Sequence, residues 1–282
     1  MAPVNHKTHF ENVGFDGYST IKVDFAQGKT IATVTINRPE AMNAFTWPML
    51  HEFRHLWRKI ALDDDINVVI LRAAAGRAFS SGADVNQGSE PGRRFDHDQV
   101  WNAEDPGEYL GPKFNQCWKP VICAVHGICA GGAFYWLNES DIIICSDDAQ
   151  FFDPHLTYGI VSALEPIGLR QRIPLGEVLR WLLLSNDERI SAQTAFDIRL
   201  VSEVQPLEKL YDRAMELAEI IAAKPSLAVQ GSLKAVWQSL DMPRSVALAT
   251  AMKYPQVGSS AASDKPDRSA IMANKRKTYE VR

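Results

Sequence analysis

Short runs of apolar residues mark the expected strands in the first half of the chain. Two of them, residues 20–25 and 30–36, are separated by Gln27-Gly28-Lys29, a sequence typical of a hairpin turn. Three later runs have the same strand-like character. The expected strands are residues 20–25, 30–36, 68–71, 121–125 and 141–145.

Apolar residues recur at helical spacing after this hairpin. Leu50, Phe53, Trp57 and Ile60 give a helix one apolar face, and Thr46 is suited to cap its first turn. From residue 162 onward the pattern is mostly helical. The expected helices there are residues 168–173, 177–184, 192–197, 207–223 and 226–240, with a further segment from residue 244.

Strands and helices therefore alternate early in the chain, and helices accumulate late. This order predicts an α/β domain, residues 1–200, followed by a helical C-terminal region, residues 201–282. The boundary falls where Pro206 precedes a helix. Residues 87–108 are rich in glycine, proline and charge, and they predict a mobile connection of the kind that often covers a site.

Composition excludes some classes of partner. The net charge of -4 over 282 residues gives no reason to expect nucleic acid or an anionic membrane as a partner. Cys117, Cys123, Cys129 and Cys145 form no C-x-x-C pair and predict buried free thiols, which suits a reducing compartment such as the cytoplasm. The polar start of the chain predicts no secretory signal, and no apolar run approaches membrane-spanning length. No metal site is expected, because no further ligands accompany the acidic triplet at residues 63–65.

Two short glycine turns are notable because each follows a predicted strand. Residues 79–84, Phe-Ser-Ser-Gly-Ala-Asp, follow the strand at 68–71, and residues 130–133, Ala-Gly-Gly-Ala, follow the strand at 121–125. Small residues let backbone N–H groups approach a ligand closely, and two N–H groups aimed at one oxygen stabilise negative charge on it. The alternative is that both turns only permit tight packing of strand against helix.

The chain resembles the crotonase superfamily, also called the enoyl-CoA hydratase/isomerase family, in four segments. They are residues 37–44 (Asn-Arg-Pro-Glu-Ala-Met-Asn-Ala), 77–84, 119–132 and the basic residues 275–277. The order and spacing of these segments carry the resemblance. It implies an α/β fold, a spiral of ββα turns with a C-terminal helical region that assembles trimers or pairs of trimers. The implied substrate is an acyl-coenzyme A thioester, so coenzyme A is carried as part of the substrate and no separate cofactor is expected.

The same resemblance implies roles for residues of the two turns. The N–H groups of Ala83 and Gly132 correspond to the oxyanion donors, and Gly132 also lies at a predicted helix start, where free N–H groups favour an anion. Arg77, Ala83 and Asp84 correspond to positions near the coenzyme A moiety. The basic residues 275–277 lie where family members often contact the nucleotide of a neighbouring subunit. The alternative for Arg77 is a surface arginine without a ligand. The alternative for residues 275–277 is a solvated helix end.

The two positions at which the family carries catalytic carboxylates hold Tyr135 and His155 in this chain. His155 can take and return a proton near neutral pH, and Asp153 can orient its imidazole unless Pro154 bends the chain. Glu165 is a third candidate acid or base, or a cap at a helix start. Tyr135 is a poor base but a usable hydrogen-bond donor. The alternative for His155 is a turn histidine without function, and the alternative for Tyr135 is an aromatic residue of the core.

These residues leave three functions open. The first is an acyl-CoA enzyme of the hydratase/isomerase type that stabilises a thioester enolate, with His155 or Glu165 as acid or base. Isomerisation needs one base to move a proton, so it tolerates the loss of a carboxylate better than hydration does. The second is a hydrolase that cuts a carbon–carbon bond beside a ketone, because some superfamily members acting on β-diketones use a histidine near this point. The third is a catalytically silent acyl-CoA binder.

Overall fold

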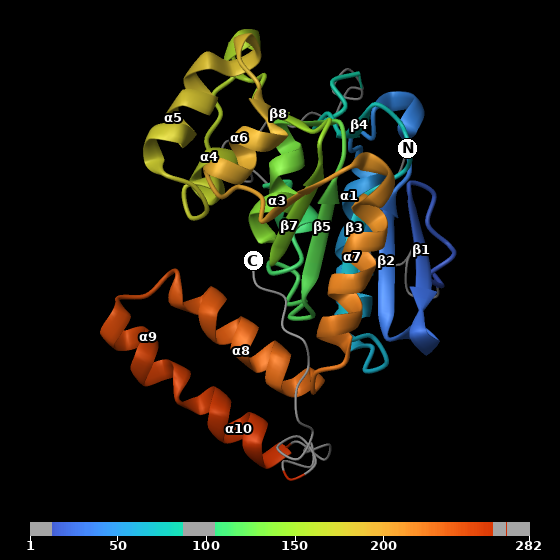
Figure 1. Cartoon of the computed structure of the whole chain (residues 1–282), viewed down its shortest axis with the longest axis vertical. Helices are drawn as coiled ribbons and strands as arrows, with labels where there is room; N and C mark the ends of the chain where they lie inside the picture. The colour runs from blue at the N-terminus through green and yellow to red at the C-terminus, as the bar shows by residue number, and fades with distance from the viewer. Residues whose placement is uncertain (1–12, 87–104, 262–268, 270–282) are drawn as a thin grey trace, which may run out of the picture. The chain divides into compact units, whose positions relative to one another are not determined.

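The computed structural model describes residues 13–86, 105–261 and 269. Its contacts divide the chain into two compact units, Met1–Ala222 and Ala223–Arg282. The first unit holds every described strand, and the second is helical in its described part (Figure 1). Most of the connection predicted at residues 87–108 and the basic tail at residues 275–277 lie outside the described residues.

The larger sheet has six strands in the order β1-β2-β3-β5-β7-β10, and Figure 1 labels all of them except β10. β1 runs antiparallel to β2, and each other neighbouring pair is parallel. The five predicted strands are confirmed and all lie in this sheet, whereas the three-residue β10 is not marked by an apolar run. The strands are β1 (Ile21–Ala26), β2 (Ile31–Ile36), β3 (Val68–Ala73), β5 (Val121–Val125), β7 (Ile142–Ser146) and β10 (Glu203–Gln205).

A smaller sheet has four short strands in the order β4-β6-β8-β9. They are β4 (Ala78–Ser80), β6 (Ile128–Ala130), β8 (Gln150–Phe152) and β9 (Ile190–Ser191). Along the chain, β4, β6 and β8 each follow a strand of the larger sheet, and these three run parallel to one another. Strands of two or three residues show no readable alternation, so the apolar pattern does not predict them.

The smaller sheet determines where the candidate residues meet. Neighbouring parallel strands have their carboxyl ends at the same edge of a sheet, which is where ligands bind in many α/β folds. The first glycine turn follows β4, the second follows β6, and the segment with Asp153 and His155 follows β8. Three segments far apart in the sequence are thereby brought to one edge.

The larger sheet is covered on both faces. Val69 and Leu71 of β3 enter a core that contains side chains of α1 (Trp47–Leu62), while Val68 and Ile70 enter a separate core beneath α7 (Leu207–Ala222). This follows from the alternation of side chains along a strand. Each fully buried aliphatic side chain contributes about 1.5–3 kcal/mol. The four cysteines are buried free thiols, as predicted.

Helix ends agree with the sequence prediction in most places. Thr46 caps α1 by accepting a hydrogen bond from the N–H of Met49 at 3.4 Å. The helix predicted at residues 168–173 is wrong in position, because α4 begins earlier and Pro166 is accommodated in its first turn. The remaining helices of the first unit are α2 (Gly107–Leu110), α3 (Phe134–Glu139), α4 (Leu164–Leu169), α5 (Leu175–Leu184) and α6 (Ala192–Asp197).

The second unit contains α8 (Ser226–Ser239), α9 (Arg244–Ala251) and α10 (Lys253–Ala261), which pack on one another. The boundary expected at residue 200 assigns α7 to the C-terminal region, whereas contacts group α7 with the sheets. Within the described ranges, no helix combines the length and the apolar character needed to cross a membrane.

Candidate active site

The two glycine turns touch each other. A Cβ atom on Gly82 would stand 2.8 Å from the carbonyl oxygen of Ala130 and 3.0 Å from the backbone nitrogen of Gly132. Gly82 also has a φ of +89°, which a side chain rarely permits. Glycine is therefore required at this position, both by the backbone conformation and by the close approach of the neighbouring turn.

Hydrogen bonds on either side hold the first turn in place. The N–H of Phe45 donates to the carbonyl oxygen of Gly82 at 2.8 Å, and the N–H of Asp84 donates to that of Phe45 at 2.9 Å. Among the described residues, the N–H of Ala83 donates in no backbone hydrogen bond outside the helices and strands. Gly132 lies in the first turn of the short 3-10 helix Gly131–Ala133, where N–H groups generally have no partner within the helix. These are the two groups expected to act as oxyanion donors, and that role stays a prediction.

His155 is held by Asp153. One carboxylate oxygen of Asp153 bonds to the ring nitrogen Nδ1 and also accepts the backbone N–H of His155 at 3.1 Å. Asp153 is fully buried. The imidazole lies against the second glycine turn, since a Cβ atom on Gly131 would stand 3.5 Å from His155 Cε1. Pro154 does not prevent this pairing.

Glu165 faces the other ring nitrogen of His155. Its Oε1 lies 3.9 Å from Nε2, which is too long for a direct hydrogen bond. Glu165 sits in the first turn of α4 and is 5% exposed. The expected position at a helix start is confirmed, and the side chain is turned into the protein beside the imidazole.

Tyr135 connects this group to a residue that the sequence did not single out. Burial raises the pKa of Tyr135, and its hydroxyl group lies close enough to Glu165 and Asp105 for both carboxylates to raise it further. Asp105 lies just before α2, where its Oδ1 accepts the N–H of Gly107 at 2.8 Å. No motif marks Asp105, because Tyr135 is distant from it in the sequence.

The surroundings shift the pKa values of these groups. The hydrogen bond with Asp153 raises the pKa of His155. Burial alone would raise the pKa of Asp153, but the hydrogen bonds it accepts, chiefly from His155, outweigh burial and lower it. Burial raises the pKa of Glu165, and burial and the charges of Glu165 and Asp105 raise that of Tyr135. Perturbed groups that converge in this way mark a candidate catalytic centre.

Ser185 fixes the segment that carries Asp153 and His155. Its hydroxyl group donates to the carbonyl oxygen of Asp153 at 2.7 Å and accepts from the N–H of Thr157 at 3.2 Å. Ser185 is buried and has a φ of +50°, an unusual conformation for a residue with a side chain. The sequence contains no signal for this role.

The residues expected near coenzyme A differ in their surroundings. Arg77 is exposed. Asp84 forms an ion pair with Arg38 at 3.1 Å, and Arg38 also donates to the carbonyl oxygen of Ala44 at 2.6 Å. Arg38 thus ties the first glycine turn to the segment at residues 37–44, a connection that the motif alone does not reveal. Contact of Arg77, Ala83 and Asp84 with coenzyme A stays a prediction.

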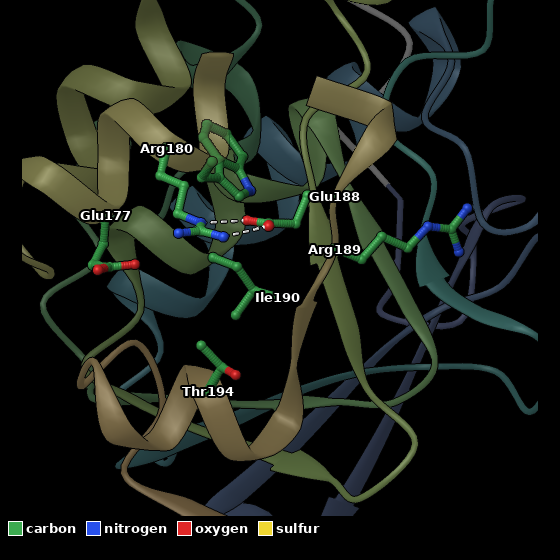
Figure 2. Close-up of a pocket in the computed structure, with 7 residues that line it drawn as sticks. Glu177, Arg180, Glu188, Arg189, Ile190 and Thr194 are labelled. Carbon is green, nitrogen blue, oxygen red and sulfur yellow. Dashed lines mark hydrogen bonds and ion pairs between the residues drawn. The ribbon is translucent and has the colours of Figure 1, made fainter. Parts of the chain in front are cut away.

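A cavity of about 300 Å³ lies elsewhere in the first unit (Figure 2). Two of the charged residues that line it, Arg180 and Glu188, contact each other directly and form a double ion pair, with both N–O distances 2.6 Å. None of the candidate catalytic residues lines this cavity, which is formed by Glu177, Arg180, Trp181, Glu188, Arg189, Ile190 and Thr194.

Comparison with known proteins places the chain in a family. The enoyl-CoA hydratase/isomerase family matches residues 26–279. The chain is 31% identical to (E)-benzylidenesuccinyl-CoA hydratase of Thauera aromatica, over 76% of this chain and 81% of that protein. It is 32% identical to the mitochondrial Delta(3,5)-Delta(2,4)-dienoyl-CoA isomerase of Mus musculus, over 79% of this chain and 70% of that protein.

Solved structures agree with this match. An enoyl-CoA hydratase/isomerase from Mycobacterium paratuberculosis superimposes with a TM-score of 0.80 at 32% identity, covering 94% of this chain and all of that one (100%). A putative short chain enoyl-CoA hydratase from Novosphingobium aromaticivorans gives a TM-score of 0.74 at 29% identity, covering 92% of this chain and 96% of that one. The chain belongs to the enoyl-CoA hydratase/isomerase family and has the crotonase fold that its sequence motifs predict.

Proposed function

We propose that the protein is an acyl-coenzyme A enzyme that transfers a proton beside the thioester carbonyl, with His155 as base and Glu165 as acid. The observation that carries this proposal is the position of His155 Nε2, 3.9 Å from Glu165 Oε1 and beside the second glycine turn. In this proposal His155 accepts the proton and Glu165 returns it, which is the work that two carboxylates do in the family pattern.

In this proposal, backbone N–H groups stabilise the negative charge that develops on the substrate. Removing a proton next to a thioester carbonyl produces an enolate, whose negative charge gathers on oxygen. The N–H groups of Ala83 and Gly132 are the proposed donors to that oxygen. Loss of one such donor typically costs about 3 kcal/mol of transition-state stabilisation. The adjacency of the two turns supports this role.

His155 is suited to take the proton. With the Nδ1 hydrogen directed to Asp153, the neutral ring presents the lone pair of Nε2 toward Glu165. The Asp153 carboxylate stabilises the imidazolium that forms. Proton transfer by a positioned side chain contributes roughly 10²–10⁴-fold to a rate.

Glu165 is suited to return a proton. Its raised pKa favours the protonated carboxyl group. In isomerisation, His155 takes a proton from one carbon and Glu165 gives a proton to another, so the substrate keeps its composition. In hydration, water adds across the double bond and the same two groups handle its protons. The related hydratase and isomerase represent both outcomes.

A second candidate function is hydrolysis of a carbon–carbon bond next to a ketone. The Asp153–His155 pair favours it, because an imidazole oriented by a buried carboxylate is the arrangement that activates a hydroxyl group or water as nucleophile. In this case the proposed oxyanion donors stabilise the departing enolate. Glu165 would then protonate the enolate carbon.

The experiment is incubation of the purified protein with crotonyl-coenzyme A and with bulky, ring-bearing and β-keto coenzyme A esters in D2O, followed by mass spectrometry. Gain of water indicates hydration, a rearranged double bond indicates isomerisation, and ring opening or cleavage indicates the hydrolase. Deuterium uptake into the acyl chain detects the enolate even without net product. Binding without any of these changes would contradict the proposal and favour a silent binder.

Variants then test the assignment of base and acid. His155→Ala should lower turnover by at least about a hundredfold, and Glu165→Gln should lower it while leaving the ester bound. His55→Gln, a change on α1, is the matched histidine control and should have no such effect. An unchanged rate in His155→Ala would remove His155 from the mechanism.

We also propose that the protein is a homotrimer or hexamer in the cytoplasm and needs no cofactor besides the coenzyme A of its substrate. The family resemblance and the buried free thiols support this proposal. Light scattering of the purified protein measures the oligomer. A monomer as the active species would contradict the oligomeric part.

A further inference from the structure

Asn138 connects the two helices that carry Tyr135 and Glu165. It lies near the end of α3, one turn after Tyr135, and its amide nitrogen Nδ2 donates to the backbone carbonyl oxygen of Glu165 at 2.9 Å. A carbonyl oxygen only accepts, so the amide nitrogen is the end of the side chain that faces α4. The contact is therefore made to the same residue whose carboxyl group lies 3.9 Å from His155 Nε2.

A glycine of α4 lets the two helices approach this closely. A Cβ atom on Gly168 would stand 2.5 Å from Nδ2 and 2.8 Å from Cγ of Asn138. A larger residue at position 168 would therefore displace the amide. Glu165 and Gly168 are three positions apart and lie on one face of the helix. Asn138 contacts this face of α4 at both residues.

Arg172 holds the backbone of the same asparagine. Its guanidinium group donates to the carbonyl oxygen of Asn138 at 2.8 and 3.2 Å and also to that of Ser140. Burial lowers the pKa of Arg172 to about 10, so the group stays charged near neutral pH. Arg172 follows α4 in the chain. Asn138 is thus bonded through its side chain to the start of α4 and through its backbone to a residue beyond the end of α4.

The sequence of α4 explains why its position depends on such contacts. The helix has only six residues, Leu-Glu-Pro-Ile-Gly-Leu. It includes a proline, which has no N–H group, and a glycine, which has high backbone freedom. A helix this short is not stable on its own in water. Pro166 and Leu169 are buried and hold α4 on the protein, but apolar burial is not directional. A hydrogen bond to one residue fixes the rotation of the helix.

The other end of the Asn138 amide shows that stability alone does not explain this residue. Its Oδ1 atom is buried and, in the part of the chain that the structure describes, has no hydrogen-bond partner. A buried polar atom without a partner costs about 1–3 kcal/mol. Leucine has nearly the same shape and avoids that cost. The hydrogen bond from Nδ2 to Glu165 is the contact that leucine cannot make.

We infer that Asn138 is a positioning residue for Glu165, because its amide sets where the carboxyl group of Glu165 lies relative to Nε2 of His155. A displacement of about 1 Å in an active site can cost about a hundredfold in rate. The inference rests on the proposed function for its effect on turnover. The position of Glu165 itself can be measured without turnover.

The test compares Asn138→Leu with the unchanged protein in crystal structures and in initial rates. The distance from Glu165 Oε1 to His155 Nε2 should increase by about 1 Å or more, and kcat should fall about a hundredfold. KM should stay nearly the same, because Asn138 acts on proton transfer and not on binding of the ester. An unchanged distance, or a kcat that does not fall, would overturn the inference.

Gly168→Ala displaces the same amide without removing it, and it serves as the test if Asn138→Leu does not fold. The added methyl group meets Nδ2 and Cγ of Asn138, so kcat should fall here too. In an Asn138→Ala background these two atoms are gone, and Gly168→Ala should lower kcat less. An equal loss in both backgrounds would show that Gly168 acts by another route and would contradict the inference.

Ser202→Ala is the matched control for loss of a bond from a side chain to a backbone carbonyl. The hydroxyl group of Ser202 donates to the carbonyl oxygen of Ile143 at 3.0 Å and, among the described contacts, to no residue of α3 or α4. This variant should lower the unfolding temperature and leave kcat unchanged. A kcat that falls as far as in Asn138→Leu would show a general effect of stability and contradict the inference.

The two proposals can fail separately. A protein that converts no acyl-CoA ester contradicts the proposed function, but the position of Glu165 in Asn138→Leu crystals still decides the inference. An active protein in which Asn138→Leu changes neither this position nor kcat contradicts the inference alone.

Discussion

Asp153 and His155 contact each other twice, through the imidazole ring and through the backbone. The same carboxylate oxygen bonds to Nδ1 and accepts the backbone N–H of His155. The ring is therefore fixed in both orientation and tautomer, with Nε2 directed away from Asp153 and toward Glu165.

Removing the charge of Asp153 should change the pH dependence of turnover. The hydrogen bond with Asp153 raises the pKa of His155 above its ordinary value of 6.5. A base acts only when unprotonated, so kcat/KM should rise with pH through this raised pKa. In Asp153→Asn the rise should move to lower pH, and the plateau should fall at least about a hundredfold. A pH profile of kcat/KM measures both, and an acid limb that stays in place would contradict the pairing.

The same contact makes a prediction about stability. The raised pKa of His155 contributes stability that is fully present below 6.5 and is lost as pH rises through the folded value. The lowered pKa of Asp153 contributes stability that is present above 3.8 and is lost as pH falls through the folded value. The stability difference between the unchanged protein and His155→Gln should therefore be largest between these two limits. Urea unfolding at a series of pH values measures it, and a difference independent of pH would contradict it.

Gly82 offers a test of the paired turns. Gly82→Ala should lower stability and abolish turnover, because its Cβ atom would meet the backbone of Ala130 and Gly132 at 2.8 and 3.0 Å. Gly28→Ala is the matched control, since Gly28 has a φ of +65° but no atom within 4 Å of the added Cβ. The control should cost about 1–2 kcal/mol for its backbone conformation and keep full turnover. Thermal unfolding and initial rates of both variants measure this, and equal rates would contradict the assignment of the turns.

Most of the larger sheet was predictable because its central strands are buried apolar runs, whereas β10 carries no such run. β3 and β5 consist almost entirely of apolar residues, and the neighbouring strands are bounded by turn residues. β6 and β8 have three residues each and depend on pairing with one another rather than on a pattern of their own. The smaller sheet therefore cannot be predicted from the apolar pattern, because its strands form only through pairing in the folded chain. Its position nevertheless decides where the candidate site forms.

The candidate site was predictable where its members are close in the sequence or belong to a motif. The glycine turns, Asp153 and His155 are of this kind. Asp105 and Ser185 are not, because the residues that each of them influences are brought near only by the fold. A serine after a leucine-rich helix and an aspartate before a short helix carry no sequence signal of their own.

Ser185 should matter for activity through the position of the Asp153–His155 segment. Ser185→Ala leaves the carbonyl oxygen of Asp153 and the N–H of Thr157 without their buried partner. Such a loss costs about 1–3 kcal/mol. Because the released segment carries the proposed base, kcat should fall together with the unfolding temperature.

Ser191→Ala separates the two effects of that change. Ser191 caps α6 by accepting the N–H of Thr194 at 3.1 Å, so its loss should cost about 1 kcal/mol of stability. It bonds to no residue of the Asp153–His155 segment among the described contacts. Ser191→Ala should therefore lower the unfolding temperature and leave kcat unchanged, whereas Ser185→Ala should lower both. If kcat follows the unfolding temperature equally in the two variants, Ser185 contributes to general stability and not to the position of His155.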